Sequence, residues 1–197
     1  TLPGYSQSNP EELLTAKNFF LLGAAKLKCN ACEHAVEDFN KAIEFEQKYA
    51  DAYYGRSLAY VCLEDYALAL KDIKQAIRQD PEQVLYRELQ GRIRSLSGDR
   101  RGAVSDFRRA LEMDSLCWQA WYGLANEHYA EVELDKSLAG YDEAIRLNPD
   151  FTMAYIGKGK LLIDMGNYPG ALAHLARAIE LEPTYAVPYT YSSLAYL

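Results

Sequence analysis

Apolar and small residues return at fixed positions when the chain is counted in equal units from residues 16, 50, 84, 118, 152 and 186. In every complete unit the twenty-fourth position is large and apolar: Phe39, Ile73, Phe107, Tyr141 and Leu175. The twenty-seventh position is always alanine: Ala42, Ala76, Ala110, Ala144 and Ala178. The eighth position is always small: Gly23, Ser57, Gly91, Ala125, Gly159 and Ser193. No insertion interrupts the count.

This spacing predicts two helices in each unit. Positions 20, 24 and 27 lie on one face of a helix, and positions 4, 8 and 11 form a similar stripe on an earlier helix. Small residues allow two helix backbones to approach closely while large neighbours interdigitate around them. Pro81, Pro149 and Pro183 each end the second helix of a unit, because proline cannot continue a helix.

The helix–turn–helix pattern of about 34 residues resembles the tetratricopeptide repeat family. The fourth unit carries the family residues most fully: Trp121, Leu124, Ala125, Tyr141, Ala144 and Pro149. The resemblance implies an all-α fold, a right-handed α-solenoid. We expect a flexible arm at residues 1–8 and a single array over residues 9–197, with Asn9 as an early N-cap. Its units are 16–49, 50–83, 84–117, 118–151, 152–185 and a partial unit or capping helix at 186–197.

Composition excludes some classes of function. The chain is 49% hydrophobic and 25% charged, and it has no apolar run long enough to span a membrane. Its net charge of -7 argues against a nucleic-acid partner.

The cysteines are too few and too irregular for a disulfide framework, which favours a reducing cytoplasm and leaves a periplasmic location open. The segment CNACEH at 29–34 contains Cys29, Cys32 and His34. We expect Cys32 to pack as a small apolar residue, without a metal ion and, in the reduced form, without an intramolecular disulfide. A redox or metal role is the alternative.

No catalytic constellation is present. His34, His128 and His174 fall at different repeat positions, and no nucleotide-binding, serine-hydrolase or zinc-protease motif occurs. The sequence therefore predicts no enzyme activity, no cofactor and no metal site.

The resemblance implies that the first helices line a concave groove. Ten residues at the expected positions are candidates for binding a partner: Phe20, Tyr54, Leu58, Arg92, Tyr122, Asn126, Tyr129, Met153, Ile156 and Lys160. The early positions are apolar and the later ones polar or basic. We expect a peptide segment with apolar side chains near the first units and an acidic group near Arg92 to Lys160. Alternatively, some of these residues pack against neighbouring helices.

One known type of repeat groove is absent. Clamps for the C-terminal carboxylate of chaperones use lysine and asparagine at positions 5 and 9 of one unit and asparagine at position 6 of the next. Here those positions hold Phe20, Ala24 and Gly55, or Tyr122, Asn126 and Gly157.

The favoured interpretation is a non-enzymatic protein–protein interaction module. A self-assembling scaffold and a regulatory arm of a larger enzyme are the alternatives. For the helix at 186–197 we expect Tyr189, Ser193 and Tyr196 to pack inward. Its opposite face, with Val187, Tyr191, Leu194 and Leu197, would then be open to a second copy or to more chain.

Overall fold

The computed structural model describes residues 15–195 of the chain, and these residues form eleven α-helices and no strand. The predicted all-α, helical-repeat fold is therefore confirmed. The helices divide between two compact units, Thr1–Ser97 and Gly98–Leu197. The predicted arm at residues 1–8 and the predicted cap Asn9 lie outside the described residues. The first helix begins later than we expected, at Ala16, where the Thr15 hydroxyl accepts a hydrogen bond from the Asn18 backbone N–H.

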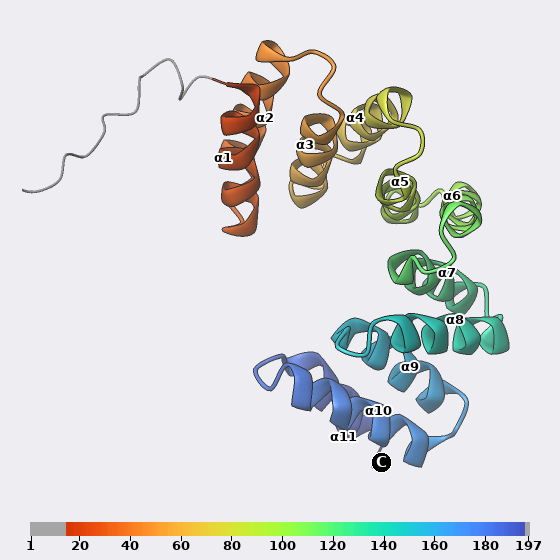
Figure 1. Ribbon diagram of the computed structural model, residues 1–197. Coiled ribbons are helices and arrows are strands. Elements are labelled where there is room, and N and C mark those ends of the chain that lie inside the picture. Colours follow the sequence, from red (N-terminus) through yellow and green to blue (C-terminus); the bar gives the residue numbers. More distant parts are fainter. Residues whose placement is uncertain (1–14, 196–197) are drawn as a thin grey trace, which may run out of the picture. The chain divides into compact units, whose positions relative to one another are not determined.

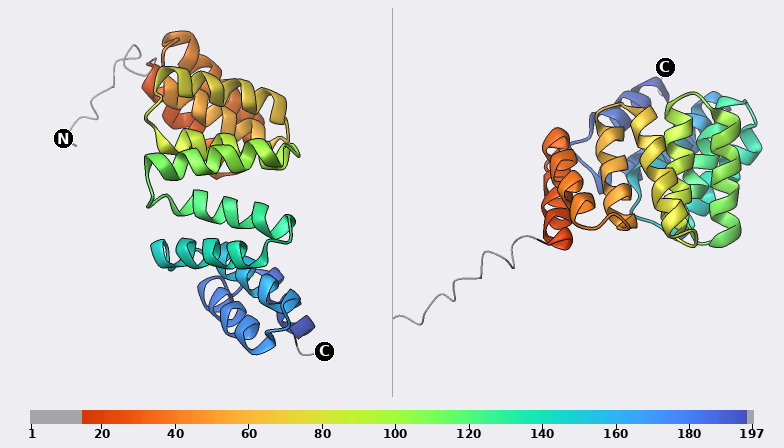
Figure 2. Two further views of the ribbon diagram at one scale, coloured as in Figure 1. Left: turned by 90° about the vertical axis from the view of Figure 1, so that its right-hand side faces the viewer. Right: turned by 90° about the horizontal axis from the view of Figure 1, so that it is seen from above.

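The first unit contains five helices, and each packs against the next along the chain (Figures 1 and 2). Their bounds are α1 (Ala16–Lys28), α2 (Cys32–Phe45), α3 (Ala50–Cys62), α4 (Tyr66–Gln79) and α5 (Val84–Leu96). In addition, α1 contacts α3, so the first helices of two successive repeats lie on the same side of α2.

The second unit contains six helices in the same kind of series (Figure 1). Their bounds are α6 (Arg100–Met113), α7 (Trp118–Ala130), α8 (Leu134–Leu147), α9 (Thr152–Asp164), α10 (Tyr168–Leu181) and α11 (Ala186–Ala195). The last helix, α11, contacts both α9 and α10.

Short polar residues and prolines mark where the second helix of a repeat begins and ends. The side chains of Asp65, Asp99 and Asn167 each accept a hydrogen bond, 3.0 Å long, from the backbone N–H three residues later. The helices α4, α8 and α10 end one residue before the cap residues that precede Pro81, Pro149 and Pro183. Proline placement thus predicted these ends correctly.

The turn between the two helices of each repeat has a residue in the left-handed region at the fifteenth position. The φ angles at this position in the five repeats are 58° at Asn30, 59° at Glu64, 88° at Gly98, 61° at Val132 and 75° at Gly166. Glycine and asparagine adopt this conformation easily, whereas β-branched valine is strained in it. Val132 is also 75% exposed, so no packing offsets the strain.

We expect Val132→Gly to stabilise the second unit by about 1 kcal/mol, because glycine removes a backbone penalty of about 1–2 kcal/mol. The greater entropy of glycine in the unfolded chain offsets part of this gain. Urea denaturation would measure the change. Glu64→Gly is the matched control, since Glu64 has the same φ but no β-branch, and its gain should be smaller. A destabilised Val132→Gly variant would contradict the assignment of strain.

The core follows one rule of packing between repeats. Within each compact unit, a large side chain at position 24 lies against position 8 of its own repeat or position 6 of the next: a Cβ built on Gly23 or Gly55 would meet the Phe39 ring at 2.9 Å or 2.6 Å. Gly123 and Gly157 face Phe107 and Tyr141 in the same way. Where position 24 is aliphatic, as at Ile73 and Leu175, position 6 is large. The side chain at position 6 is thus absent where an aromatic ring at position 24 occupies its space.

Candidate functional site

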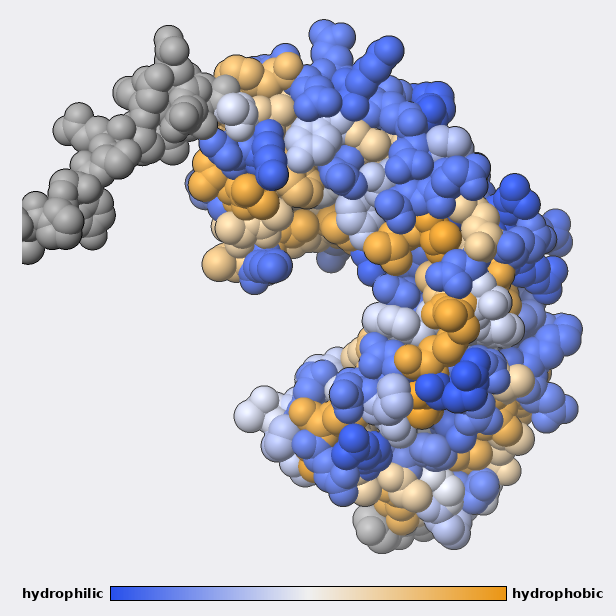
Figure 3. All heavy atoms as spheres, in the orientation of Figure 1, coloured by the Kyte–Doolittle hydropathy of each residue, from blue (hydrophilic) through white to orange (hydrophobic). Residues whose placement is uncertain are grey.

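An apolar cavity of 350 Å³ opens in the first unit between α1, α2 and α3. Its lining contains three of the predicted groove residues, Phe20, Tyr54 and Leu58. The other lining residues are Ala24, Leu27, Lys28, Phe39 and Gly55. We call these eight residues the apolar pocket. Hydrophobic side chains also gather on the surface around α1 (Figure 3).

Helix geometry explains why these side chains converge. Phe20, Ala24 and Leu27 are spaced i, i+4, i+7 on α1, and Tyr54 and Leu58 are spaced i, i+4 on α3. Each of these two sets therefore presents one face of its helix to the same cavity.

The floor of the pocket was not predicted from the sequence. The Phe39 ring comes from α2 and lies against Gly55, whose missing side chain leaves room for it. The signal was available, because an aromatic residue at position 24 is followed by glycine at position 6 in three repeats.

Charged groups lie beside the pocket on α5. Burial raises the pKa of the Glu88 carboxyl, and the Arg92 guanidinium acts in the opposite direction. Burial, followed by the nearby Glu88 charge, raises the pKa of the Tyr54 hydroxyl, so this phenol stays protonated. Tyr54 also stacks on Tyr86, with ring centroids 5.1 Å apart. The pocket thus has an apolar interior with a phenol and an exposed arginine at its α5 side.

The remaining predicted residues belong to the second unit, where several of them contact one another. The Tyr129 hydroxyl donates to the Asp164 carboxylate, and Lys160 Nζ lies 4.9 Å from the centroid of the Tyr129 ring. Asn126 Oδ1 accepts a hydrogen bond of 2.6 Å from the Tyr141 hydroxyl. These contacts create a polar face on α7 and α9.

The other three predicted residues of the second unit differ in their surroundings. The Tyr122 ring contacts the rings of Tyr141 and Phe151, with centroids 6.0 Å and 4.9 Å apart. Met153 is exposed. Ile156 is buried in a cluster against which Tyr185, Val187 and Tyr191 pack. Ile156 therefore follows the alternative stated for these residues, that some of them pack against neighbouring helices.

The packing face predicted for α11 is also wrong. Tyr189 and Ser193 are exposed, whereas Pro188 is buried and Val187 and Tyr191 pack against a cluster formed by α9 and α10. Position 8 of a complete repeat can face the second helix of the same repeat, as Gly159 faces Leu175. In α11 the side chains that pack inward are instead at positions 2, 3 and 6. Leu194 is exposed, as expected. Tyr196 and Leu197 lie outside the described residues.

The expectation for the cysteines does not hold in this structure. Cys32 forms a disulfide with Cys62 of the following repeat, while Cys29 and Cys117 keep their thiols. The two cysteines are 30 residues apart in the sequence, so spacing alone does not indicate that they pair. They are close in space because α2 packs on α3, which brings Cys32, the first residue of α2, beside Cys62, the last residue of α3.

One group of side chains in the second unit has the composition of a metal site. Ligand atoms of His128, Glu131 and Glu133 lie within 4.8 Å of one another. Glu133 is already occupied, since it accepts from Lys136 at 2.7 Å and lies 2.5 Å from His128 Nδ1. Arg101 and Arg108 line the same cavity, so its charge disfavours a further cation.

Between residues 15 and 195, no helix is both long and apolar enough to cross a membrane.

Comparisons with known proteins identify the family. Residues 88–151 match one tetratricopeptide repeat model, and residues 50–83 and 154–185 match a second one. The chain belongs to the tetratricopeptide repeat family. Such repeats generally act as non-enzymatic modules, and the chain is accordingly a protein–protein interaction module.

Curated relatives share the repeats but are much longer. DnaJ homolog subfamily C member 7 homolog of Schizosaccharomyces pombe is 25% identical over 90% of this chain and 41% of its own length. TPR repeat-containing protein MJ1428 of Methanocaldococcus jannaschii is 29% identical over 56% of this chain and 19% of its own length. The chain thus spans less than half the length of these two relatives.

Solved structures show the same fold. TTC0263, a thermophilic repeat protein of Thermus thermophilus, aligns with a TM-score of 0.82 and 19% identity, covering 93% of this chain and 100% of its own. YrrB, described as having an unusual peptide-binding site, aligns with a TM-score of 0.61 and 22% identity, covering 93% of this chain and 94% of its own.

Proposed function

We propose that this chain binds a peptide segment of another protein, and that a large apolar side chain of the segment enters the apolar pocket. The observation that carries the proposal is the cavity of 350 Å³ with its almost wholly apolar lining. Pockets of this size can enclose a ligand group and gain the free energy of its apolar burial. The peptide-binding site described for the structural neighbour YrrB supports this class of ligand.

The chemistry around the pocket suggests what flanks that side chain. Lys28 is exposed at one edge, and Arg92 is exposed on α5 beside Tyr54 and Glu88. An acidic group in the segment would be attracted to Lys28 or Arg92. In the second unit, Lys160 forms no ion pair among the described contacts, so it is a further candidate for an acidic group.

Selection from a phage-displayed library of short random peptides on the immobilised chain would identify ligands. Calorimetry on a selected peptide would then measure its affinity. We expect enriched peptides to share a large apolar residue.

Leu58→Asp should weaken the binding of such a peptide at least about tenfold. A tenfold change in affinity corresponds to a loss of about 1.4 kcal/mol of binding free energy, and burying an unpaired carboxylate costs more than this. Leu63→Asp is the matched control, because Leu63 is an exposed leucine outside the pocket.

Circular dichroism would verify that both variants are folded, and Leu58→Ala provides a milder change at the same site. Equal affinities of the wild type and all three variants would show that the pocket is not the binding surface.

Self-association is the second candidate, because Tyr189 and Leu194 of α11 are about half exposed at 47% and 49%. Exposed apolar side chains close together often mark a contact. Sedimentation equilibrium distinguishes the two functions. If the chain remains monomeric at high concentration, self-assembly is excluded and the peptide-binding proposal is unchanged.

A further inference from the structure

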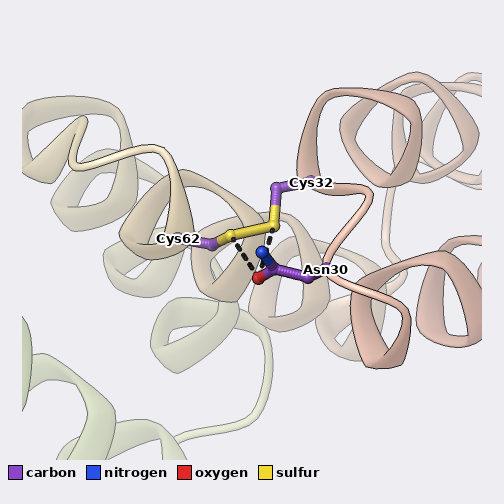
Figure 4. The surroundings of a disulfide bond; sticks show 3 residues. All are labelled: Asn30, Cys32 and Cys62. Atoms are coloured by element: carbon purple, nitrogen blue, oxygen red, sulfur yellow. Dashed lines mark hydrogen bonds between the residues drawn. A yellow bond between two sulfur atoms is a disulfide. The ribbon is translucent and has the colours of Figure 1, made fainter.

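The disulfide joins the beginning of α2 to the end of α3, two of the helices that line the apolar pocket (Figure 4). The Cα atoms of Cys32 and Cys62 are 6.3 Å apart, a usual distance for a disulfide. Leu58 of the pocket precedes Cys62 by one helical turn, and Leu27 and Lys28 end the helix that leads into this region. The bridge therefore ties together the elements that form one end of the pocket.

A third cysteine lies in the same turn. Cys29 is the C-cap of α1, is exposed and carries a free thiol, with only two residues between it and Cys32. Asn30 turns the chain back with φ of 58°. Its Oδ1 atom lies 3.9 Å from Cys32 Sγ and 3.5 Å from Cys62 Sγ, which places the turn against the bridge (Figure 4). The thiol of Cys29 therefore belongs to the residue next to Asn30, whose side chain lies close to both bridge sulfurs.

The two bridge sulfurs differ in their access to solvent. Cys32 is 1% exposed, so thiols in solution cannot reach its sulfur readily, whereas Cys62 is exposed. A thiolate supplied by the same turn of the chain has a much higher effective concentration at this sulfur than a thiol in solution. The Cys-x-x-Cys spacing suits exchange, because two cysteines separated by two residues in a turn before a helix can form a disulfide with each other.

We propose that Cys29, Cys32 and Cys62 form a thiol–disulfide exchange site. Cys29 loses its proton to water, and its thiolate sulfur bonds to Cys32 Sγ. The bond between Cys32 and Cys62 breaks, and Cys62 leaves as a thiolate that takes up a proton. One disulfide and one thiol are present before and after, so the step consumes no oxidant or reductant.

The exchange moves a covalent constraint. In the Cys32–Cys62 form the bridge holds α3 against α2 at the end of the pocket. In the Cys29–Cys32 form the bridge lies within the α1–α2 turn, and α3 is held by side-chain packing alone. The site would therefore set how firmly the wall containing Leu58 is held; this consequence rests on the proposed function, whereas the exchange itself does not.

Disulfide mapping tests the exchange directly. The chain is purified without reductant, quenched in acid to stop further exchange, digested with pepsin and mapped by mass spectrometry. We expect two populations in the wild type, one with Cys32–Cys62 and one with Cys29–Cys32. Cys29→Ser should contain the first pairing alone, and Cys117→Ser, the matched control, should reproduce the wild-type mixture. A wild-type map with Cys29 always present as a thiol would overturn the proposal.

A second variant tests the alternative pairing. Cys62→Ser, folded by circular dichroism and oxidised with glutathione disulfide, should form Cys29–Cys32 in most molecules. Recovery of both cysteines as thiols or as glutathione adducts would overturn the proposal. Cys62→Ala repeats the test if the serine variant is unfolded.

The link between the bridge and the pocket has its own test. A phage-selected peptide should bind Cys62→Ser several-fold more weakly than it binds Cys117→Ser. Equal affinities would overturn the link to the pocket.

Discussion

Arg56→Met should destabilise the first unit by about 3–5 kcal/mol, because it leaves a buried carboxylate without its partner. Arg56 Nε and Nη2 donate to the two carboxylate oxygens of Asp72 at 2.6 Å and 2.8 Å, and Nη1 donates to Asn40 Oδ1 at 2.6 Å. The Asp72 side chain is only 4% exposed, so water cannot replace the lost hydrogen bonds. One arginine on α3 thus satisfies polar groups of both α2 and α4.

Urea denaturation of four chains would measure this effect. The wild type, Arg56→Met, Asp72→Leu and the double variant form a double-mutant cycle. The double variant should recover most of the stability, because replacing both partners removes the uncompensated charge. Arg109→Met is the control, since its pair with Glu112 is exposed and should contribute less than about 1 kcal/mol. A cost for Arg56→Met as small as that of the control would contradict the buried-pair argument.

Gly123→Leu should destabilise the second unit by about 2 kcal/mol or more. A Cβ at this position would lie 2.4 Å from the Phe107 ring, and that ring is 2% exposed and has no free space to move into. Overpacking of this kind costs about 1–3 kcal/mol and sometimes more. The better helix propensity of leucine offsets at most about 1 kcal/mol.

The repeat itself suggests the compensating change. Ile73 and Leu89 occupy the positions that correspond to Phe107 and Gly123, so Phe107→Ile combined with Gly123→Leu recreates a pair that the chain already contains. Phe107→Ile alone should cost about 2 kcal/mol because it leaves a cavity. We expect the double variant to be more stable than the sum of the two single costs implies, by at least about 1 kcal/mol. Strictly additive costs would refute the proposed size matching.

The same pairs explain why a carboxylate clamp is absent. The clamp needs asparagine at position 6 of the unit that follows the one with lysine and asparagine at positions 5 and 9. At that position this chain has Gly55 or Gly157. An asparagine side chain there would occupy the space of the Phe39 or Tyr141 ring. The core of these repeats and that kind of binding site therefore exclude each other.

The sequence alone determined the repeat and most of its register. Small residues at positions 8, 20 and 27 are required wherever two helices cross closely, so they recur whatever the repeat binds. All five alanines at position 27 are indeed fully buried. Helix periodicity also placed Phe20, Tyr54 and Leu58 on faces that meet in one pocket, because residues of one face can be counted from spacing alone.

Only the tertiary structure decided which partners those faces meet. Ile156 satisfied the spacing for a groove residue, yet it is buried in a cluster against which side chains of α10, α11 and the connection between them pack. The Cys32–Cys62 pairing, the Phe39 floor and the role of Gly55 likewise depend on residues of different helices coming together. Periodicity specifies the direction of a side chain from its own helix, whereas burial and contact depend on what the neighbouring helix places opposite it.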